Sequence, residues 1–124
     1  YLRKVIRPDM PAQYNRVAAK SIVTLLSNWR SKRGALFHDG IVPSHAVSYF
    51  VGCWAWDCWR FSAAMASFYP ELAKDNIRVM FDYQQPDGMI IDCIYPDASA
   101  NNERPILRRG RSTRSTSTPT TRPL

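Results

Sequence analysis

The chain has 124 residues, of which 45% are hydrophobic and 22% charged, and its formal net charge at pH 7 is +7. This length and composition suit one small globular domain with a modest core. No apolar run reaches about 18 residues, so a membrane span is not expected, and three cysteines are too few for a disulfide framework.

Residues 9–29 are predicted to form the first helix. Asp9 is the expected N-cap, and Pro11 suits the first turn. Apolar residues then recur at a spacing of three to four, at Tyr14, Ala18, Ile22, Leu25 and Trp29. Residues 30–55 are expected to be irregular, because glycines and Pro43 interrupt them.

Two further helices are predicted, over residues 57–68 and 71–84. The first is apolar nearly all round, which is typical of a helix buried on several sides. Pro70 suits the start of the second, and Glu71 and Asp75 lie toward its positive N-terminal end. A short turn at residues 69–70 separates the two ranges and gives a helix–loop–helix pattern, which could be part of a helical toroid.

An extended segment follows the second of these helices. Pro86-Asp87-Gly88 is a strong turn signal, and residues 89–95 are mostly apolar with no helical period. This run fits either a strand or an extended loop across the mouth of a cavity.

The C-terminal end changes in composition. Residues 1–102 carry 11 Lys and Arg against 9 Asp and Glu, whereas residues 103–124 carry six Arg against one Glu. From residue 108 onward almost every residue is Arg, Ser, Thr, Pro or Gly, which cannot build a core. We therefore expect a folded unit over 1–104 and a disordered basic tail over 105–124, and we do not expect nucleic acid as a partner of the folded unit.

The strongest candidates for a functional site lie just before and within the second predicted helix. Trp54, Trp56 and Trp59 surround one carboxylate, Asp57. Aromatic rings match the apolar faces of sugars, and a carboxylate matches their hydroxyl groups, so this pattern favours a sugar site. The alternative interpretation is that the three Trp residues belong to the core and Asp57 only caps the helix.

Other candidates for chemistry are less specific. Asp39, Asp92 and Asp97 could pair with Asp57 as acid and base, since glycoside hydrolysis usually needs two carboxyl groups, but they are equally well explained as solvated loop acids. A second set of residues could be considered as metal ligands, namely His38, His45, Cys53 and Cys58. Their spacing matches no zinc pattern, so no metal site and no cofactor is predicted.

An ordered series of short motifs resembles glycoside hydrolase family 63. The series runs Asn28-Trp29-Arg30-Ser31, Val42-Pro43-Ser44, Trp54 to Trp59, and Pro70 to Arg78, and the likeness extends over roughly residues 14–104. Each motif is weak alone, whereas their order and spacing are specific. The nearest likeness is to bacterial members, including the alpha-glucosidase and mannosylglycerate-hydrolase-like groups.

The resemblance implies an all-α chain that forms the first helices of an (α/α)6 barrel. It implies inverting hydrolysis of an alpha-linked glucose or mannose unit without a cofactor, with an oligosaccharide or glycoside as substrate. It assigns substrate binding to Trp56 and Asp57, and less firmly to Arg104. The general acid and base would belong to later helix pairs, so the chain is expected to be an inactive fragment whose partner is the missing C-terminal part of its own barrel.

The sequence departs from the family after Asn101-Asn102-Glu103-Arg104. The family continues with a polar pair, Lys-Pro-Pro and an Ala-rich run to Trp, whereas this chain has Pro105 and an Arg-rich stretch. Reading the codons for Arg109-Gly110 one base earlier gives a codon that ends in GG and can encode Trp. This favours a frameshifted tail. The alternatives are a genuine basic tail and, for the whole chain, a small helical binding module whose tail engages nucleic acid or acidic surfaces.

Overall fold

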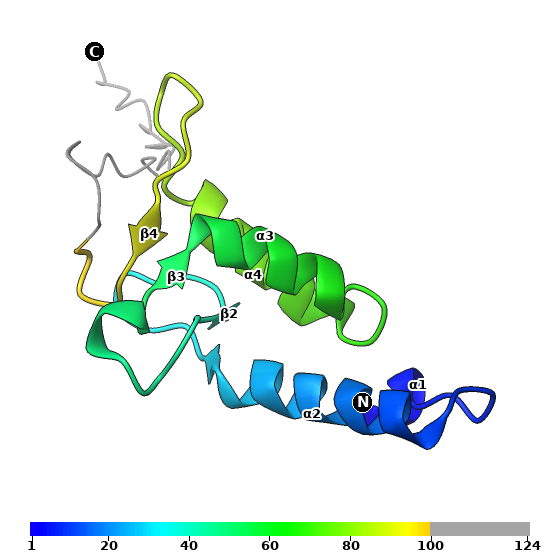
Figure 1. The fold of residues 1–124 in the computed structure, drawn as a ribbon. Coiled ribbons are helices and arrows are strands. Elements are labelled where there is room, and N and C mark those ends of the chain that lie inside the picture. The colour runs from blue at the N-terminus through cyan, green and yellow to red at the C-terminus, as the bar shows by residue number, and fades with distance from the viewer. Residues whose placement is uncertain (100–124) are drawn as a thin grey trace, which may run out of the picture.

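The computed structural model describes residues 1–99, and these form a helix-rich structure with two small antiparallel sheets (Figure 1). The elements in chain order are α1 (Leu2–Val5), α2 (Ala12–Ser27), β1 (Trp29–Arg30), β2 (Gly40–Ile41), the 3-10 turn η1 (Ser48–Phe50), β3 (Cys53–Trp54), α3 (Ala55–Met65), α4 (Pro70–Phe81) and β4 (Cys93–Ile94). The expected tail over 105–124 and the candidate Arg104 lie outside the described residues.

The expectation of an all-α chain is wrong in one respect, because four short strands pair. β1 pairs with β2, with Trp29 opposite Ile41, and β3 pairs with β4, with Trp54 opposite Cys93. Each strand has only two residues; a loop joins β1 to β2, whereas the α3–α4 hairpin lies between β3 and β4. The pairing satisfies backbone groups that would otherwise be buried without partners in the segments around the helices.

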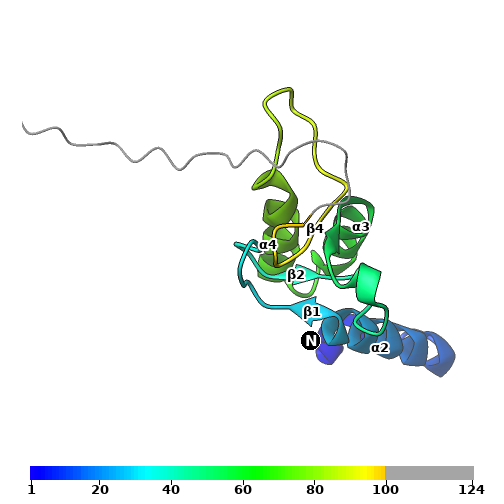
Figure 2. The same ribbon diagram turned by 90° about the vertical axis from the view of Figure 1, so that its left-hand side faces the viewer.

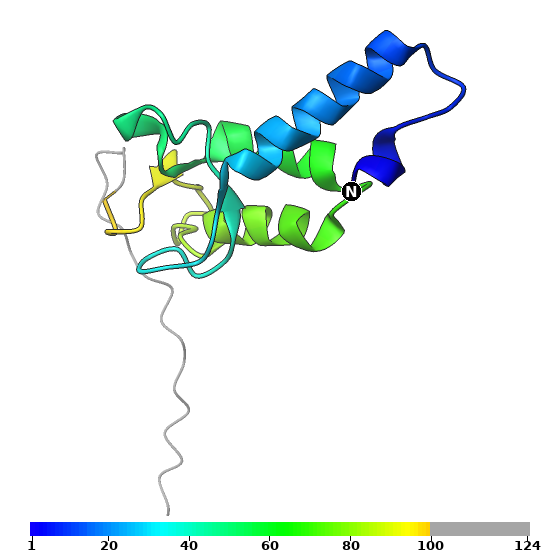
Figure 3. The ribbon, with the colours of Figure 1, turned by 90° about the horizontal axis from the view of Figure 1, so that it is seen from below.

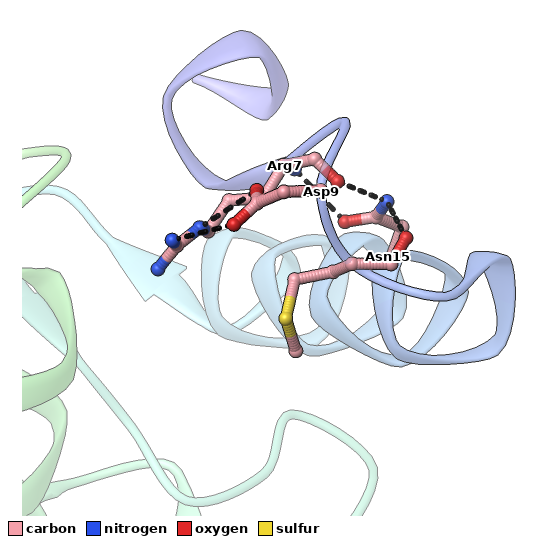
Figure 4. A network of polar contacts seen from close by, with 4 residues as sticks. Arg7, Asp9 and Asn15 are labelled. Carbon is pink, nitrogen blue, oxygen red and sulfur yellow. Dashed lines mark hydrogen bonds and ion pairs between the residues drawn. The ribbon is translucent and has the colours of Figure 1, made fainter.

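The first predicted helix is shorter than expected, and Asp9 is not its N-cap. α2 begins at Ala12 with Pro11 at the cap position, and no side chain caps its first turn. Asp9 instead forms an ion pair with Arg7 at 2.9 Å, and Asn15 accepts a hydrogen bond from the Arg7 backbone N–H and donates to the Arg7 backbone oxygen (Figure 4). These contacts hold the connection from α1 to α2, so the chain turns before the long helix starts.

Helices α3 and α4 correspond to the two predicted helices, with ends that differ by a few residues, and together they form a hairpin. α3 starts two residues earlier than expected, at Ala55, and ends at Met65, so Phe68 lies in the turn between the helices. α4 starts at Pro70, whose missing backbone N–H costs nothing in a first turn, and Glu71 lies in that turn. The two helices lie side by side, and α2 runs obliquely past them (Figure 3).

The composition of α3 suggested burial on several sides, but the helix is buried on one face only. Its buried residues are Cys58, Ser62 and Met65, which all lie on one face. Trp56 and Trp59 are exposed on the opposite side. The apolar composition of this helix therefore produces an exposed aromatic surface as well as a buried face.

The core has two apolar clusters that share the α3–α4 hairpin. The first cluster consists of Ala35, Leu36, Val42, Cys53, Cys58, Val79, Met80, Tyr83, Ile91 and Ile94. The second consists of Ile22, Ile41, Met65, Phe68, Leu72 and Ala73, with Val5, Leu25 and Leu26 packed against it. Only the second receives side chains from α1 and α2.

A buried amide joins the loop before α3 to both helices of the hairpin. Asn76 is fully buried on α4 and accepts a hydrogen bond from the backbone N–H of Ile41. Its Nδ2 donates to the backbone oxygen of Cys58 and to Ser62 Oγ. All the polar groups of this side chain are therefore used to fix β2 across α3 and α4.

The loop at residues 31–39 is hydrogen-bonded to the segment that follows β4, at Pro96. Ala35 donates its backbone N–H to the Pro96 oxygen at 2.8 Å, and the Tyr83 hydroxyl donates to the Ala35 oxygen. Gly34 has φ of +55°, and a Cβ there would come within 2.2 Å of the Pro96 oxygen. Only glycine therefore allows the two segments to approach this closely.

Candidate functional site

The first turn of α3 stands on the edge of the β3–β4 pair. Trp54 occupies the cap position, and the backbone N–H of Ala55 donates to the Asp92 oxygen at 2.8 Å. This bond continues the β3–β4 ladder by one residue and satisfies the first free donor of the helix. It also fixes the direction in which the next two side chains, Trp56 and Asp57, leave the backbone.

Asp57 lies in this first turn but is not the helix cap. No side chain caps α3, and Asp57 is its third residue. Burial raises the pKa of the Asp57 carboxyl above its usual value, while a hydrogen bond from its own backbone N–H and the Arg60 charge oppose the rise. A partly dehydrated carboxylate of this kind is a strong acceptor for ligand hydroxyl groups.

Within residues 1–99, Trp56 is the most exposed of the large apolar residues, with 68% of its surface accessible. The guanidinium carbon of Arg60 lies 4.4 Å from the centroid of its ring, which is a cation–π contact. Trp56 therefore does not belong to the core. Arg60 covers one face of the indole and leaves the rest of the ring to solvent.

The other two Trp residues of the predicted patch point elsewhere. Trp54 is half-buried and packs edge-on against Phe50, with ring centroids 5.9 Å apart. Trp59 packs against Phe81 of α4 at 6.1 Å. The structure thus brings only Trp56 together with Asp57, and the three Trp residues do not form one surface around the carboxylate.

The other acidic candidates have separate surroundings. Asp39 accepts hydrogen bonds from Trp29 Nε1 at 3.0 Å and from the Lys32 backbone N–H at 2.9 Å. Asp97 accepts from both the backbone N–H and the hydroxyl of Ser99, which lowers its pKa. The Asp92 side chain is exposed. Within residues 1–99, the charge that acts on Asp57 comes from Arg60, and no second carboxyl contributes to its pKa.

The histidines and cysteines considered as metal ligands do not come together. His38 Nδ1 lies 2.7 Å from Asp82 Oδ2, and His45 Nδ1 lies 3.0 Å from an Arg30 nitrogen. Cys53 and Cys58 are buried free thiols in the first cluster. In the part of the chain that the structure describes, no three His, Cys, Asp or Glu residues are placed to share a metal ion.

Arg60 is the residue of this site that sequence reasoning missed. It follows Trp56 by four positions on α3, and residues at this spacing share a helix face, so the periodicity could have identified it. The predicted contribution of Arg104 remains a prediction, because that residue lies outside the described range.

An open groove on α2 lies away from Asp57. It has a volume of about 700 Å³ and runs along the outer face of α2 alone. Its lining residues are Gln13, Arg16, Val17, Lys20, Ser21, Thr24 and Leu25. We place the candidate sugar site at Trp56 and Asp57 because the lining of the groove contains neither a carboxylate nor an aromatic ring.

Comparison with known protein families gives no match to this chain. Among the described helices, none combines the length and apolar character that crossing a bilayer requires.

The start of α3 places one partly buried carboxylate beside one exposed indole and one guanidinium, and this arrangement suits binding a polyhydroxylated ligand.

Proposed function

We propose that this chain is part of a family 63-like glycosidase and holds one sugar ring at Trp56 and Asp57. The observation that carries the proposal is the pairing of an exposed indole with a partly buried carboxylate in the first turn of α3. The α3–α4 hairpin is in keeping with the first helix pairs of an (α/α)6 barrel, which the ordered motifs also favour.

The proposed division of labour gives binding to this chain and bond cleavage to the rest of the barrel. Inverting hydrolysis needs an acid and a base on opposite faces of the sugar, and each is a carboxyl group. Asp57 would accept hydrogen bonds from sugar hydroxyl groups while Trp56 covers an apolar edge of the ring. The substrate would be an alpha-linked glucoside or mannoside, and no cofactor takes part.

Ligand binding by the chain itself is the first test. The backbone amide signals of α3 are followed by NMR while methyl alpha-glucoside or methyl alpha-mannoside is added. We expect saturable shifts in the wild type and their loss in Trp56→Ala and Asp57→Asn. Trp59→Ala is the matched control, since Trp59 lies on the same helix and packs against Phe81. Equal binding by all four proteins would contradict the proposal.

Catalysis is the second test. We expect no hydrolysis of alpha-glucosides or mannosides by this chain, and turnover above that of an Asp57→Ala control would assign the chemistry to Asp57.

Resequencing and extending the gene would reveal whether a one-base shift restores a helical continuation. In the restored enzyme Asp57→Asn should lower kcat/KM at least about tenfold with little change in Tm, because hydrogen bonds to a charged acceptor contribute roughly 1.5–3 kcal/mol each.

The alternative, a small helical module that binds through its basic tail, depends on residues 103–124, which the structure does not describe. A verified stop codon after Leu124 and a start near Tyr1 would favour it over the glycosidase proposal.

A further inference from the structure

Arg60 contacts a different residue of α3 from the one that its spacing suggests. On α4, two acids pair at 2.9 Å with the base three positions later, in Glu71–Lys74 and Asp75–Arg78. Asp57 and Arg60 have the same spacing and the same acid-first order on α3. Within residues 1–99, no ion pair joins them. Arg60 lies over the Trp56 ring instead, with its guanidinium carbon 4.4 Å from the ring centroid.

This contact follows from the direction of side chains on a helix. Side chains lean toward the N-terminus of a helix, so Arg60 reaches back over the residue four positions earlier, which is Trp56. The long apolar stem of Arg60 and its planar guanidinium both match the face of an indole. Because the ring holds the guanidinium, Arg60 acts on the Asp57 carboxyl only through its charge and does not cover the carboxylate oxygens with an ion pair.

Trp56 in turn depends on Arg60 for its orientation. Figure 2 shows α4 beside α3 and α2 below both, so α3 keeps one side that no other described element covers. The Trp56 side chain is 68% exposed. Within the described part of the chain, no other aromatic ring is stacked or edge-on against it. Arg60 is therefore the ring contact that favours one rotamer of Trp56.

We propose that Arg60 is the positioning residue of the candidate sugar site. It holds the Trp56 ring by one face, so that a sugar stacks on the opposite face, and it leaves the Asp57 carboxylate unpaired for the sugar hydroxyl groups. This inference rests on the proposed binding of a sugar at Trp56 and Asp57. It adds that the indole is held in its binding orientation before the sugar arrives, which removes the entropic cost of ordering the ring on binding.

The expected effect of Arg60 is modest but measurable. A cation–π contact at an exposed site changes the ratio of two side-chain conformers about two- to fivefold. A ligand that binds one conformer loses affinity in proportion to the fraction of that conformer. Loss of the Arg60 side chain should therefore weaken sugar binding by up to about fivefold.

The orientation of Trp56 can be measured without any sugar. Three-bond couplings between the Trp56 backbone and its ring carbon report the populations of its rotamers. One rotamer should dominate in the wild type, whereas the couplings in Arg60→Ala should move toward averaged values. Arg60→Lys keeps a cation on a long stem and should restore the wild-type couplings. Arg78→Ala removes an exposed arginine of α4 and should leave them unchanged. Wild-type couplings in Arg60→Ala would overturn the proposal.

Sugar binding is the second measurement, with the backbone amides of α3 followed while methyl alpha-glucoside is added. Arg60→Ala should bind up to about fivefold more weakly and Arg60→Lys like the wild type. NOEs between Arg60 and the Trp56 ring should persist at saturation. Tighter binding by Arg60→Ala, or loss of these NOEs when the sugar binds, would mean that Arg60 occupies the face that the sugar uses, and the proposal would be wrong.

These outcomes separate the role of Arg60 from the proposed function. A wild type that binds neither methyl alpha-glucoside nor methyl alpha-mannoside refutes the sugar site, while the Trp56 couplings still decide whether Arg60 orients the ring. Saturable binding with equal affinity in the wild type and Arg60→Ala refutes the role of Arg60 alone.

A double-variant cycle tests whether Trp56 keeps Arg60 away from Asp57. Without the ring, Arg60 can pair with Asp57, as acids and bases at this spacing do on α4. Arg60→Met should therefore raise the pKa of Asp57 by more in a Trp56→Ala background than in the wild-type background. Comparison within each background cancels the change in burial that Trp56→Ala causes. Equal rises in both backgrounds would show that the ring does not divert the guanidinium. Circular dichroism confirms folding of each variant.

Discussion

The side-chain oxygen of Asn76 accepts a hydrogen bond from the backbone N–H of Ile41 at 2.8 Å. Ile41 belongs to β2 and Asn76 to α4, so the bond joins segments 35 residues apart in the sequence. The same amide donates to Cys58 and Ser62 on α3, and one fully buried side chain thereby connects three elements.

Replacement of Asn76 by Leu should therefore be strongly destabilising. The side chain keeps a similar volume, but the Ile41 N–H and the Cys58 oxygen lose their partners while still buried, and each such group costs about 1–3 kcal/mol. We expect a loss of about 3 kcal/mol or more in the free energy of unfolding, measured by urea denaturation. Lys74→Ala, which breaks an exposed pair on the same helix, should cost less than about 1 kcal/mol. Similar losses for both variants would contradict the role given to Asn76.

The protonation of Asp57 should depend on Arg60. Burial raises the pKa of Asp57 and Arg60 lowers it, so Arg60→Met should raise the pKa of Asp57 further. The carboxyl pKa can be read from the pH dependence of its carbon-13 chemical shift. Lys at position 60 keeps the positive charge, so an Arg60→Lys protein should titrate close to the wild type. An unchanged value in Arg60→Met would show that the guanidinium does not act on this group.

The raised pKa of Asp57 also sets the sign of a pH effect. A carboxyl whose pKa is higher in the folded state binds protons more tightly there, so its contribution to stability is fully present below its unfolded pKa and is lost as pH rises through the folded pKa. Asp57→Asn removes this dependence. The stability of the wild type relative to Asp57→Asn should therefore fall as pH increases upward from about 4, in melts followed at several pH values. Sugar binding, which needs the carboxylate, should change in the opposite direction.

Gly34 should not tolerate a side chain. A Cβ at this position would lie 2.2 Å from the Pro96 oxygen, and its φ of +55° is unfavourable for other residues. We expect Gly34→Ala to cost about 2–4 kcal/mol, from backbone strain and overpacking together. Gly88→Ala is the comparison, because Gly88 also has positive φ but a Cβ there meets only Gln84 Nε2 at 4.0 Å. Its cost should be limited to about 1–2 kcal/mol of strain, and Tm values of both variants measure the difference.

The three cysteines should resist thiol reagents in the native protein. Cys53, Cys58 and Cys93 are buried, and a hydrogen bond with the Cys53 thiol together with burial raises the pKa of Cys58. Because the thiolate is the reactive form, labelling by a disulfide reagent should be slow without denaturant and should reach three groups per chain in urea. Fast labelling of the native chain would mean that the first cluster opens readily.

Local patterns in the sequence predict the helices better than the sheets. The spacing of apolar residues and Pro70 identify α3 and α4 to within three residues of their ends. The start of α2 was misjudged because the Asp9 carboxylate, which could have capped the helix, pairs instead with Arg7 two positions away. Strands of two residues carry no period, and the partner of Cys53 in β4, Ile94, lies beyond the whole α3–α4 hairpin in the sequence.

The same contrast applies to the candidate site. Trp56 and Asp57 are neighbours in the sequence, so their proximity was certain, and Arg60 follows from helical spacing. The degree of burial of Asp57 and the separate directions of Trp54 and Trp59 depend on η1, β4 and α4, which approach from distant parts of the chain. Single-sequence patterns do not contain that information.

The sharing of the α3–α4 hairpin by two clusters has a consequence for how the molecule opens. The first cluster includes no residue of α1 or α2. These helices can therefore separate from the hairpin by breaking contacts of the second cluster alone. Backbone amides of α2 should then exchange with solvent through a partial opening of lower free energy, while Val79 and Met80 exchange only on global unfolding. The chain would thus behave as a stable hairpin with an arm that can detach, and this arm carries five of the eleven Lys and Arg residues within positions 1–99.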